Sequence, residues 1–148
     1  MIPSDPVSAS KMRTFMAKYD SEMIGPLFAI YLKKFRPEGA EDFLARAVPL
    51  LEKFCANTTD GKWLMGTDDL TLADIHMGAM WDFIYVYNKA EAYQSTFSLI
   101  KLETTAPLWI SYMERLRAHP KIAPTCMNQE AANRMAERSA AWTAEEKC

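Results

Sequence analysis

The chain has 148 residues, enough for one domain with a single hydrophobic core. Hydrophobic residues make up 49% of the sequence and charged residues 24%, a composition typical of globular proteins that excludes collagen-like and disordered classes. The 17 basic and 19 acidic residues give a net charge of −2 and are scattered along the chain. Because no basic patch accumulates, we expect no nucleic-acid partner.

The cysteines and histidines argue against a metal site. Cys55, Cys126 and Cys148 lie far apart, and His76 and His119 are the only histidines. A zinc site needs about four such ligands, usually in closely spaced pairs, so we expect no metal. An odd set of unpaired cysteines favours reduced thiols, and the first ten residues lack a signal-peptide core or an arginine-rich presequence. We therefore expect an intracellular, cytoplasmic protein.

The first predicted helix follows a linker-like segment over residues 1–7. Ser8 or Ser10 would cap it, because a serine hydroxyl accepts a hydrogen bond from an amide of the first turn. Gly25-Pro26 interrupts the pattern, since proline lacks a backbone donor and clashes with the preceding turn, so we expect a kink or two collinear helices. The apolar stripe that predicts the helix consists of Met12, Phe15, Met16, Tyr19, Met23, Leu27 and Ile30.

A second helix is predicted over residues 41–56. Glu41 and Asp42 lie in its first turn, where the helix dipole favours negative charge. Pro49 lies inside this run, and we expect it to bend the helix. Residues 57–61, Asn-Thr-Thr-Asp-Gly, then form a turn.

The start of the third helix is specified twice. Thr71 and Asp74 have the spacing of a capping box, in which each side chain bonds the backbone amide of the other residue. Leu70 and Ile75 have the spacing of a hydrophobic staple across the same helix start. We assign these four residues a structural role.

The helix over residues 72–88 is apolar on nearly every face, which is typical of a central core helix or a membrane span. Asp74, His76 and Asp82 interrupt it, and about 17 residues is at the short limit for a bilayer. The pattern therefore predicts a core helix and no membrane span.

The remaining chain continues the helical pattern. Residues 97–102 suggest a short helical or irregular piece, and Pro107 occupies the first position of a helix that stops before His119. A polar helical tail follows over 127–148. Its narrow apolar stripe consists of Met127, Ala131, Met135 and Trp142. The sequence thus predicts an all-α bundle of five to six helices with a polar helical tail.

Two stretches carry a resemblance to a known family. Residues 46–53 read R-x-x-P-x-x-E-K, and residues 64–76 read L-x-G-x-x-x-L-T-x-A-D-I-H. In this order, between a long interrupted helix and a proline-started one, they resemble the C-terminal all-helical domain of cytosolic glutathione transferases, nearest to the alpha and sigma-like classes. The resemblance spans residues 8–126. It implies a glutathione transferase C-terminal-like helical bundle, in which the capping box is a folding device.

The resemblance implies a role for Arg46 at glutathione. It matches an alpha-class arginine that reaches the glutathione of the partner subunit, a charge-assisted contact to a carboxylate. The alternative is a solvated arginine on an amphipathic helix. Thr14 stands about where alpha-class enzymes carry the acidic residue that accompanies this arginine, so the match is incomplete.

The resemblance also implies what the apolar stripe of the first predicted helix faces. Met12, Phe15, Met16 and Tyr19 lie where the first helical residues of the family face the substrate cleft. Core or domain-interface packing is the alternative, because apolar stripes at helical spacing usually pack. Left uncovered, this surface would be a candidate docking site.

No catalytic residue is assigned. Asp74 has its capping role, and no nucleophile or second ligand accompanies His76. In the tail, Met135 and Trp142 could form a lid like the C-terminal helix of alpha-class enzymes, or dock on a partner as a helix in a groove. A solvated helix is the third interpretation.

In the family, catalysis and glutathione binding depend mainly on a thioredoxin-like N-terminal domain. Residues 1–148 do not supply that domain, so the resemblance implies a non-catalytic structural or protein-interaction subunit or adaptor. Its partner would be a protein or a second copy, bound through apolar helical faces, with no cofactor. The alternative is the substrate-binding half of a two-domain glutathione transferase that conjugates glutathione to hydrophobic electrophiles, with glutathione bound if the other domain is supplied elsewhere.

Overall fold

The computed structural model describes the backbone of residues 2–32 and 35–145 and the side chains of residues 2–30 and 35–138. Within these ranges the chain is helical and contains no strand, as predicted. The α-helices are α1 (Pro6–Leu32), α2 (Ala40–Cys55), α3 (Leu72–Tyr87), α4 (Gln94–Ile100), α5 (Leu102–Thr105), α6 (Pro107–Ala118) and α7 (Gln129–Glu145). Short 3₁₀ helices are η1 (Pro37–Gly39), η2 (Thr59–Gly61), η3 (Glu91–Tyr93) and η4 (Ala123–Thr125).

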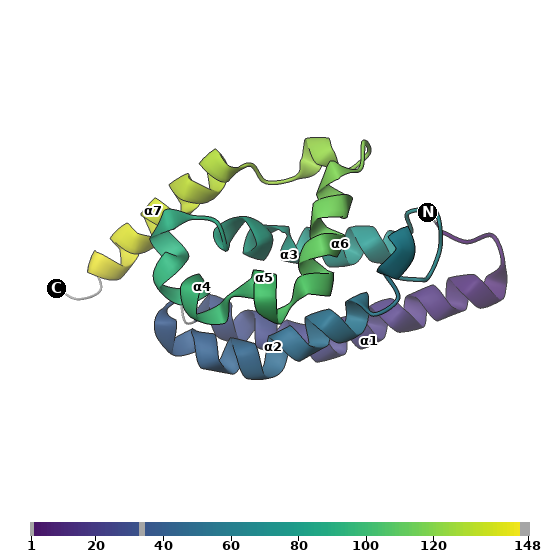
Figure 1. The fold of residues 1–148 in the computed structure, drawn as a ribbon, viewed down its shortest axis with the longest axis horizontal. Coiled ribbons are helices and arrows are strands. Elements are labelled where there is room, and N and C mark those ends of the chain that lie inside the picture. The colour runs from purple at the N-terminus through teal and green to yellow at the C-terminus, as the bar shows by residue number, and fades with distance from the viewer. Residues whose placement is uncertain (1, 33–34, 146–148) are drawn as a thin grey trace.

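The two longest elements, α1 and α2, run side by side along the long axis of the molecule (Figure 1). The α3 helix packs between α1 and α6, and α4, α5 and α6 pack against α2. The first turns of α1 extend beyond the other helices at one end, and α7 lies at the opposite end against α3 and η3 (Figure 1). None of the described helices is long and apolar enough to cross a membrane.

The start of α1 differs from the prediction. The helix begins at Pro6, and the Ser8 backbone N–H donates to Asp5 Oδ2 at 2.7 Å, so Asp5 and not Ser8 or Ser10 is the N-cap. This bond is the main cause of the lowered pKa of Asp5. Proline is well suited to the first helical position, where its missing donor costs nothing. The sequence Asp5-Pro6 signals this helix start, and the prediction that a serine caps the helix did not take it into account.

Neither internal proline ends its helix. Pro26 lies inside the continuous α1, and Pro49 lies inside α2. Met23 and Leu27 on either side of Pro26 are both buried in the same core. Packing on both sides of the proline therefore outweighs the lost backbone hydrogen bond, and α1 is not divided at Gly25-Pro26.

The α3 helix is the central core helix, as predicted. Its Trp81 is fully buried, with ring centroids 6.1 Å from Phe43 of α2 and 6.2 Å from Trp109 of α6. These aromatic contacts join three helices at the centre of the molecule. These contacts hold α3 in place against its neighbours, and they thereby support the surface that α1 and α3 form together.

A second aromatic cluster closes the end of α1. Phe35 has φ 53°, an unusual left-handed conformation for a bulky residue, and its N–H donates to Ile30 O at 3.1 Å. Its ring lies 5.2 Å from Tyr87 and 5.1 Å from Tyr93, and its carbonyl accepts the Thr96 hydroxyl. The buried ring contacts compensate for the backbone strain at this turn.

Candidate functional site

The capping box at the start of α3 is a buried hub. The Thr71 N–H donates to Asp74 Oδ2 at 2.8 Å, and the Thr71 hydroxyl reaches the same oxygen at 2.6 Å. The other carboxylate oxygen accepts the Leu64 N–H at 2.9 Å, and the Tyr112 hydroxyl of α6 donates to the Asp74 carbonyl at 3.2 Å. Asp74 thus ties the preceding loop and α6 to α3, and all its interactions are structural.

The loop before this hub explains the glycine of the 64–76 motif. Gly66 has φ 71°, a conformation that favours glycine, and its N–H donates to Trp63 O at 2.7 Å. The turn brings the Leu64 amide to Asp74. Leu70 is buried and Ile75 is partly buried against the same core, and a staple contact between the two stays a prediction.

The stripe on α1 divides between the core and the surface. Met12 and Tyr19 are 1% and 0% exposed, so these two candidates face the core of this domain. Phe15 and Met16 are partly exposed. The Phe15 ring contacts Phe54 of α2 at a centroid distance of 5.5 Å. Of the four candidates, Phe15 and Met16 are the ones with side-chain surface left to contact another molecule.

Met16 belongs to a wider apolar surface, which we call the α1–α3 face. Residues four apart share one side of a helix, so Met16, Asp20 and Ile24 line up along α1. His76, Met80 and Phe83 line up in the same way along α3. Ile24 is 41% exposed, and the other five side chains are partly exposed. The face is defined by these six residues, two of them polar.

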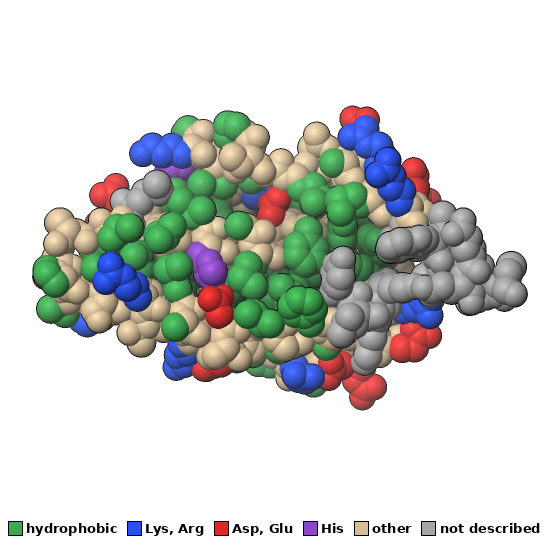
Figure 2. All heavy atoms as spheres, turned by 180° about the vertical axis from the view of Figure 1, so that it is seen from behind, with side chains coloured by type: hydrophobic (Ala, Val, Ile, Leu, Met, Phe, Trp, Pro, Cys, Tyr) green, Lys and Arg blue, Asp and Glu red, His purple; other side chains and the backbone are tan. Residues whose placement is uncertain are grey.

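A hydrogen bond between the two helices lies within this face. His76 Nε2 lies 2.6 Å from Asp20 Oδ1, and the two side chains are 30% and 38% exposed. The hydrogen-bond partner of His76 therefore lies on another helix, 56 residues away in the chain. Figure 2 shows one histidine beside an acidic side chain amid a broad hydrophobic area on the far side of the molecule.

Arg46 lies on the outer surface of α2. Its side chain is 54% exposed and pairs with Asp42 at 3.6 Å, one turn earlier. It also passes near Gly25 of α1, where an added Cβ would lie 3.6 Å from the guanidinium. The arginine thus lies on the α1–α2 side with an exposed guanidinium and one surface ion pair, and it has further donors with which to bind an anion.

Two other residues of the same motif have clear structural roles that sequence reasoning missed. Glu52 Oε1 accepts the Trp109 N–H at 3.1 Å, and Trp109 is the third residue of α6. Lys53 bonds Glu22 of α1 at 2.7 Å. No local signal pointed to Glu52, because the N-cap position before Pro107 is Ala106 and the acceptor lies 57 residues away in the chain.

The tail packs through a different seam from the one predicted. Ala132 and Ala136 are both 0% exposed, whereas Met135 is 48% exposed and its sulfur accepts the Tyr87 hydroxyl at 3.6 Å. The small alanines let α7 approach α3 and η3 closely. Trp142 falls within α7, but its side chain lies outside the described residues. The backbone of α7 lies at the opposite end of the molecule from the first turns of α1 (Figure 1).

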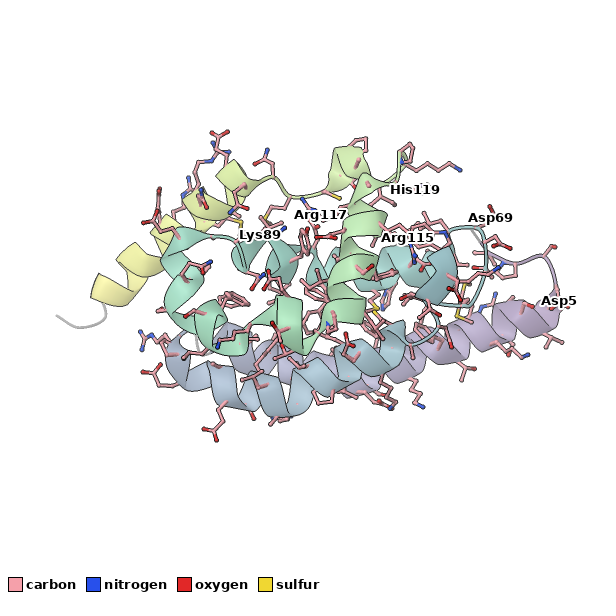
Figure 3. All side chains as sticks on the ribbon, viewed as in Figure 1. Asp5, Asp69, Lys89, Arg115, Arg117 and His119 are labelled. Carbon is pink, nitrogen blue, oxygen red and sulfur yellow. The ribbon has the colours of Figure 1, made fainter. Side chains whose placement is uncertain are left out.

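A polar network anchors the segment that precedes α7. The Arg117 guanidinium pairs with Asp82 of α3 and donates to Met127 O at 2.7 Å, while the Met127 N–H donates to Asp82 Oδ2 at 2.7 Å. Arg115 projects from the other side of α6, where it donates to Thr58 O and Lys62 O (Figure 3). These arginines tie together segments far apart in the chain.

The buried thiol and hydroxyls are held in their protonated forms. Burial raises the pKa of Cys55, Tyr19 and Tyr112 well above their usual values. The negative charge of nearby Asp74 adds to the shift for Cys55 and Tyr112. None of these groups is therefore ready to act as a nucleophile or base at neutral pH. Within the described ranges, no group of three or more metal-ligating side chains could hold an ion.

Comparison with known proteins identifies the architecture. A family model described as "Glutathione S-transferase, C-terminal domain" matches residues 26–124, from within α1 to η4, which is more than half of the chain. No curated protein and no solved structure matches the chain.

Proposed function

Because the chain belongs to the family of glutathione S-transferase C-terminal domains, we propose that it acts as a non-catalytic structural and protein-interaction module, a subunit or adaptor. The observation that carries this proposal is the α1–α3 face. Its Met16, Ile24, Met80 and Phe83 leave apolar surface exposed around one hydrogen-bonded polar pair. Contiguous apolar surface of this kind marks interaction sites in soluble proteins.

The chemistry of the described residues supports binding over catalysis. A thiol transferase needs a group that stabilises or generates a thiolate. The buried hydroxyls of Tyr19 and Tyr112 hold their protons tightly and are closed to solvent. The His76–Asp20 pair is accessible, but no nucleophile bonds to it among the described side chains. What the face offers is apolar contact area.

The alternative is the substrate-binding half of a two-domain glutathione transferase that conjugates glutathione to hydrophobic electrophiles. The exposure of Arg46, together with that of Phe15 and Met16, favours this function. The guanidinium has free donors for a glutathione carboxylate, and the side chains on α1 would contribute an apolar wall. The two functions differ in whether the chain itself binds glutathione.

Calorimetry with glutathione and a conjugation assay with an electrophilic aromatic substrate test the proposal. We expect neither binding nor turnover. Binding that is lost in Arg46→Ala but kept in Lys18→Ala, another exposed cation with a 57% exposed side chain, would instead establish the alternative. Turnover by the chain alone would overturn the non-catalytic function.

A further inference from the structure

A lysine and a tyrosine one helical turn apart form a polar pair where α3 ends. Tyr85 lies in the last turn of α3 and is 8% exposed, whereas Lys89, just beyond the helix, is exposed. The Lys89 ammonium nitrogen lies 2.9 Å from the Tyr85 hydroxyl oxygen and 4.4 Å from the centroid of the tyrosine ring. Lys89 therefore folds back over the tyrosine, and we call this pair the Tyr85–Lys89 site.

The direction of this hydrogen bond leaves a donor free. An ammonium group has no lone pair, so Lys89 donates and the tyrosine oxygen accepts. The hydroxyl hydrogen of Tyr85 then has no acceptor among the residues that the structure describes. A largely buried donor without an acceptor is unfavourable. The site therefore offers one hydroxyl hydrogen and the remaining ammonium hydrogens to a ligand that carries lone pairs.

The site also has a surplus of positive charge. Besides the Lys89 ammonium group, the Arg117 guanidinium of α6 lies 5.1 Å from the centroid of the same tyrosine ring. Arg117 pairs with Asp82, but no carboxylate of the described side chains pairs with Lys89. Glu103 of α5 accepts a hydrogen bond from the neighbouring Asn88 side chain at 2.7 Å. The groups at the ring thus carry one unbalanced positive charge, which a single anion neutralises.

Two of the three side chains around the site are held in place before any ligand binds. The Tyr85 ring packs against Trp109 at a centroid distance of 6.3 Å. Arg117 donates to the Met127 carbonyl oxygen at 2.7 Å, and Figure 3 shows it on the side of α6 toward Lys89. Only the Lys89 side chain has to become ordered when a ligand binds, so the entropic cost of binding is small.

We propose that the Tyr85–Lys89 site binds a carboxylate group. A carboxylate carries the single negative charge that balances the site, and its two oxygens accept from two donors at once. One oxygen accepts the Tyr85 hydroxyl, and the other accepts a hydrogen of the Lys89 ammonium group. Both hydrogen bonds involve an ionised partner and are therefore stronger than neutral ones. The site goes beyond the proposed function, because it recognises a charge whereas the α1–α3 face offers apolar contact.

Titration of the nitrogen-15-labelled full chain with sodium acetate, followed by nuclear magnetic resonance, tests this site. Sodium chloride at equal ionic strength is the reference. We expect saturable shifts of the amides of residues 85–89 and 117, with an acetate Kd in the millimolar range. Lys89→Gln removes the positive charge and should raise this Kd at least tenfold, the usual effect of losing a charge-assisted bond. Tyr85→Phe keeps the ring but removes the donor, and should raise the Kd several-fold.

Lys11→Gln is the matched control, because Lys11 is an exposed lysine in the first turns of α1, at the opposite end of the molecule from α7. It should leave the acetate Kd unchanged, and circular dichroism melts establish that each variant is folded. Shifts that chloride reproduces, an unchanged Kd in Tyr85→Phe, or an equal loss in Lys11→Gln and Lys89→Gln would each overturn the proposal. Inorganic phosphate that binds with a lower Kd than acetate would overturn the assignment to a carboxylate.

Discussion

Gly78 leaves room for the side chain of Leu116 where α3 packs against α6. A Cβ added there would lie 2.2 Å from Cδ2 of Leu116, which is itself 2% exposed. Glycine in a helix interior normally costs about 1 kcal/mol relative to alanine. At this position the absence of a side chain is what lets the two helices pack.

Gly78→Ala should therefore destabilise the protein. Overpacking costs about 1–3 kcal/mol, and the better helix propensity of alanine returns about 1 kcal/mol, so we expect a small net loss. In a Leu116→Ala background the steric conflict is gone, and the same substitution should stabilise. Urea unfolding of the four proteins in this cycle measures the coupling. A Gly78→Ala effect that is the same in both backgrounds would contradict the close approach.

Thr71 contributes to stability through its side-chain oxygen. Thr71→Ala removes the hydroxyl that lies 2.6 Å from Asp74 Oδ2, and loss of a helix cap typically costs about 1 kcal/mol. Thr71→Ser keeps the hydroxyl and serves as the control, with a smaller loss. Guanidinium unfolding curves measure both variants. Equal midpoints for Thr71→Ala and the wild type would show that the capping box does not stabilise α3.

Cys55 should report global unfolding. Its thiol is 0% exposed with a raised pKa, whereas Cys126 is partly exposed. Because Cys148 lies outside the described residues, the assay uses the Cys148→Ser variant. With a thiol reagent at pH 8, we expect rapid labelling of Cys126 and labelling of Cys55 only at the unfolding rate. Mass spectrometry of the peptides distinguishes the sites, and fast labelling of Cys55 would mean that the core opens locally.

The Cys55 thiol also predicts how the stability of the fold changes with pH. A thiol pKa that is raised in the folded state contributes stability that is present below the unfolded pKa, about 8.5, and lost as pH rises above it. Tyr112 acts in the same direction at higher pH. Melting temperatures should therefore fall from about pH 9 upward, and less steeply in Cys55→Ala. An unchanged slope in that variant would exclude Cys55 as a contributor.

At the scale of elements, α6 depends on α2 for its start. Its N-cap residue is Ala106, and the Glu52 carboxylate from α2 accepts the Trp109 N–H in place of a local cap. A sequence window around Pro107 cannot reveal this cap, because the acceptor is 57 residues away. The motif Glu52-Lys53 thus joins α2 to α6 through one residue and to α1 through the other.

Glu52→Ala should cost about 1 kcal/mol of unfolding free energy, as for the loss of an ordinary cap. Glu52→Gln keeps an oxygen acceptor at the same position and should cost less. Hydrogen exchange of the first-turn amides of α6 gives a local readout, since the Trp109 amide should lose protection in the alanine variant. Protection that is unchanged in Glu52→Ala would rule out the cap.

The helices show where the periodicity of apolar residues is enough to predict how a helix packs and where it is not. The all-apolar pattern of α3 predicted a central helix, and Trp81 between Phe43 and Trp109 confirms it. Of the two expectations for Gly25-Pro26, the division into two collinear helices is wrong, because tertiary packing along α1 outweighs local propensity. The predicted apolar stripe of α7 also differs from the one that packs. The buried residues are Ala132 and Ala136, whose small size allows close packing, and a pattern based on hydrophobicity does not take size into account.

At the scale of the whole molecule, different parts of the surface carry different candidate features. The α1–α2 side carries the exposed Arg46, the α1–α3 face carries the apolar side chains, and α7 occupies the opposite end from the first turns of α1. A lid of α7 over the first turns of α1 would require it to leave its contacts with α3 and η3. The proposed non-catalytic function depends on the α1–α3 face alone.

The sequence by itself determined the helical class, the capping box and the family, because helical spacing and capping act over a few residues and are written locally. Only the tertiary structure decided which candidates reach the surface. Met12 and Tyr19 share a stripe with Phe15 and Met16, yet the first two are buried and the others are not. The His76–Asp20 bond and the Glu52 cap likewise join residues more than 50 positions apart. Such contacts depend on how helices pack, which no local pattern specifies.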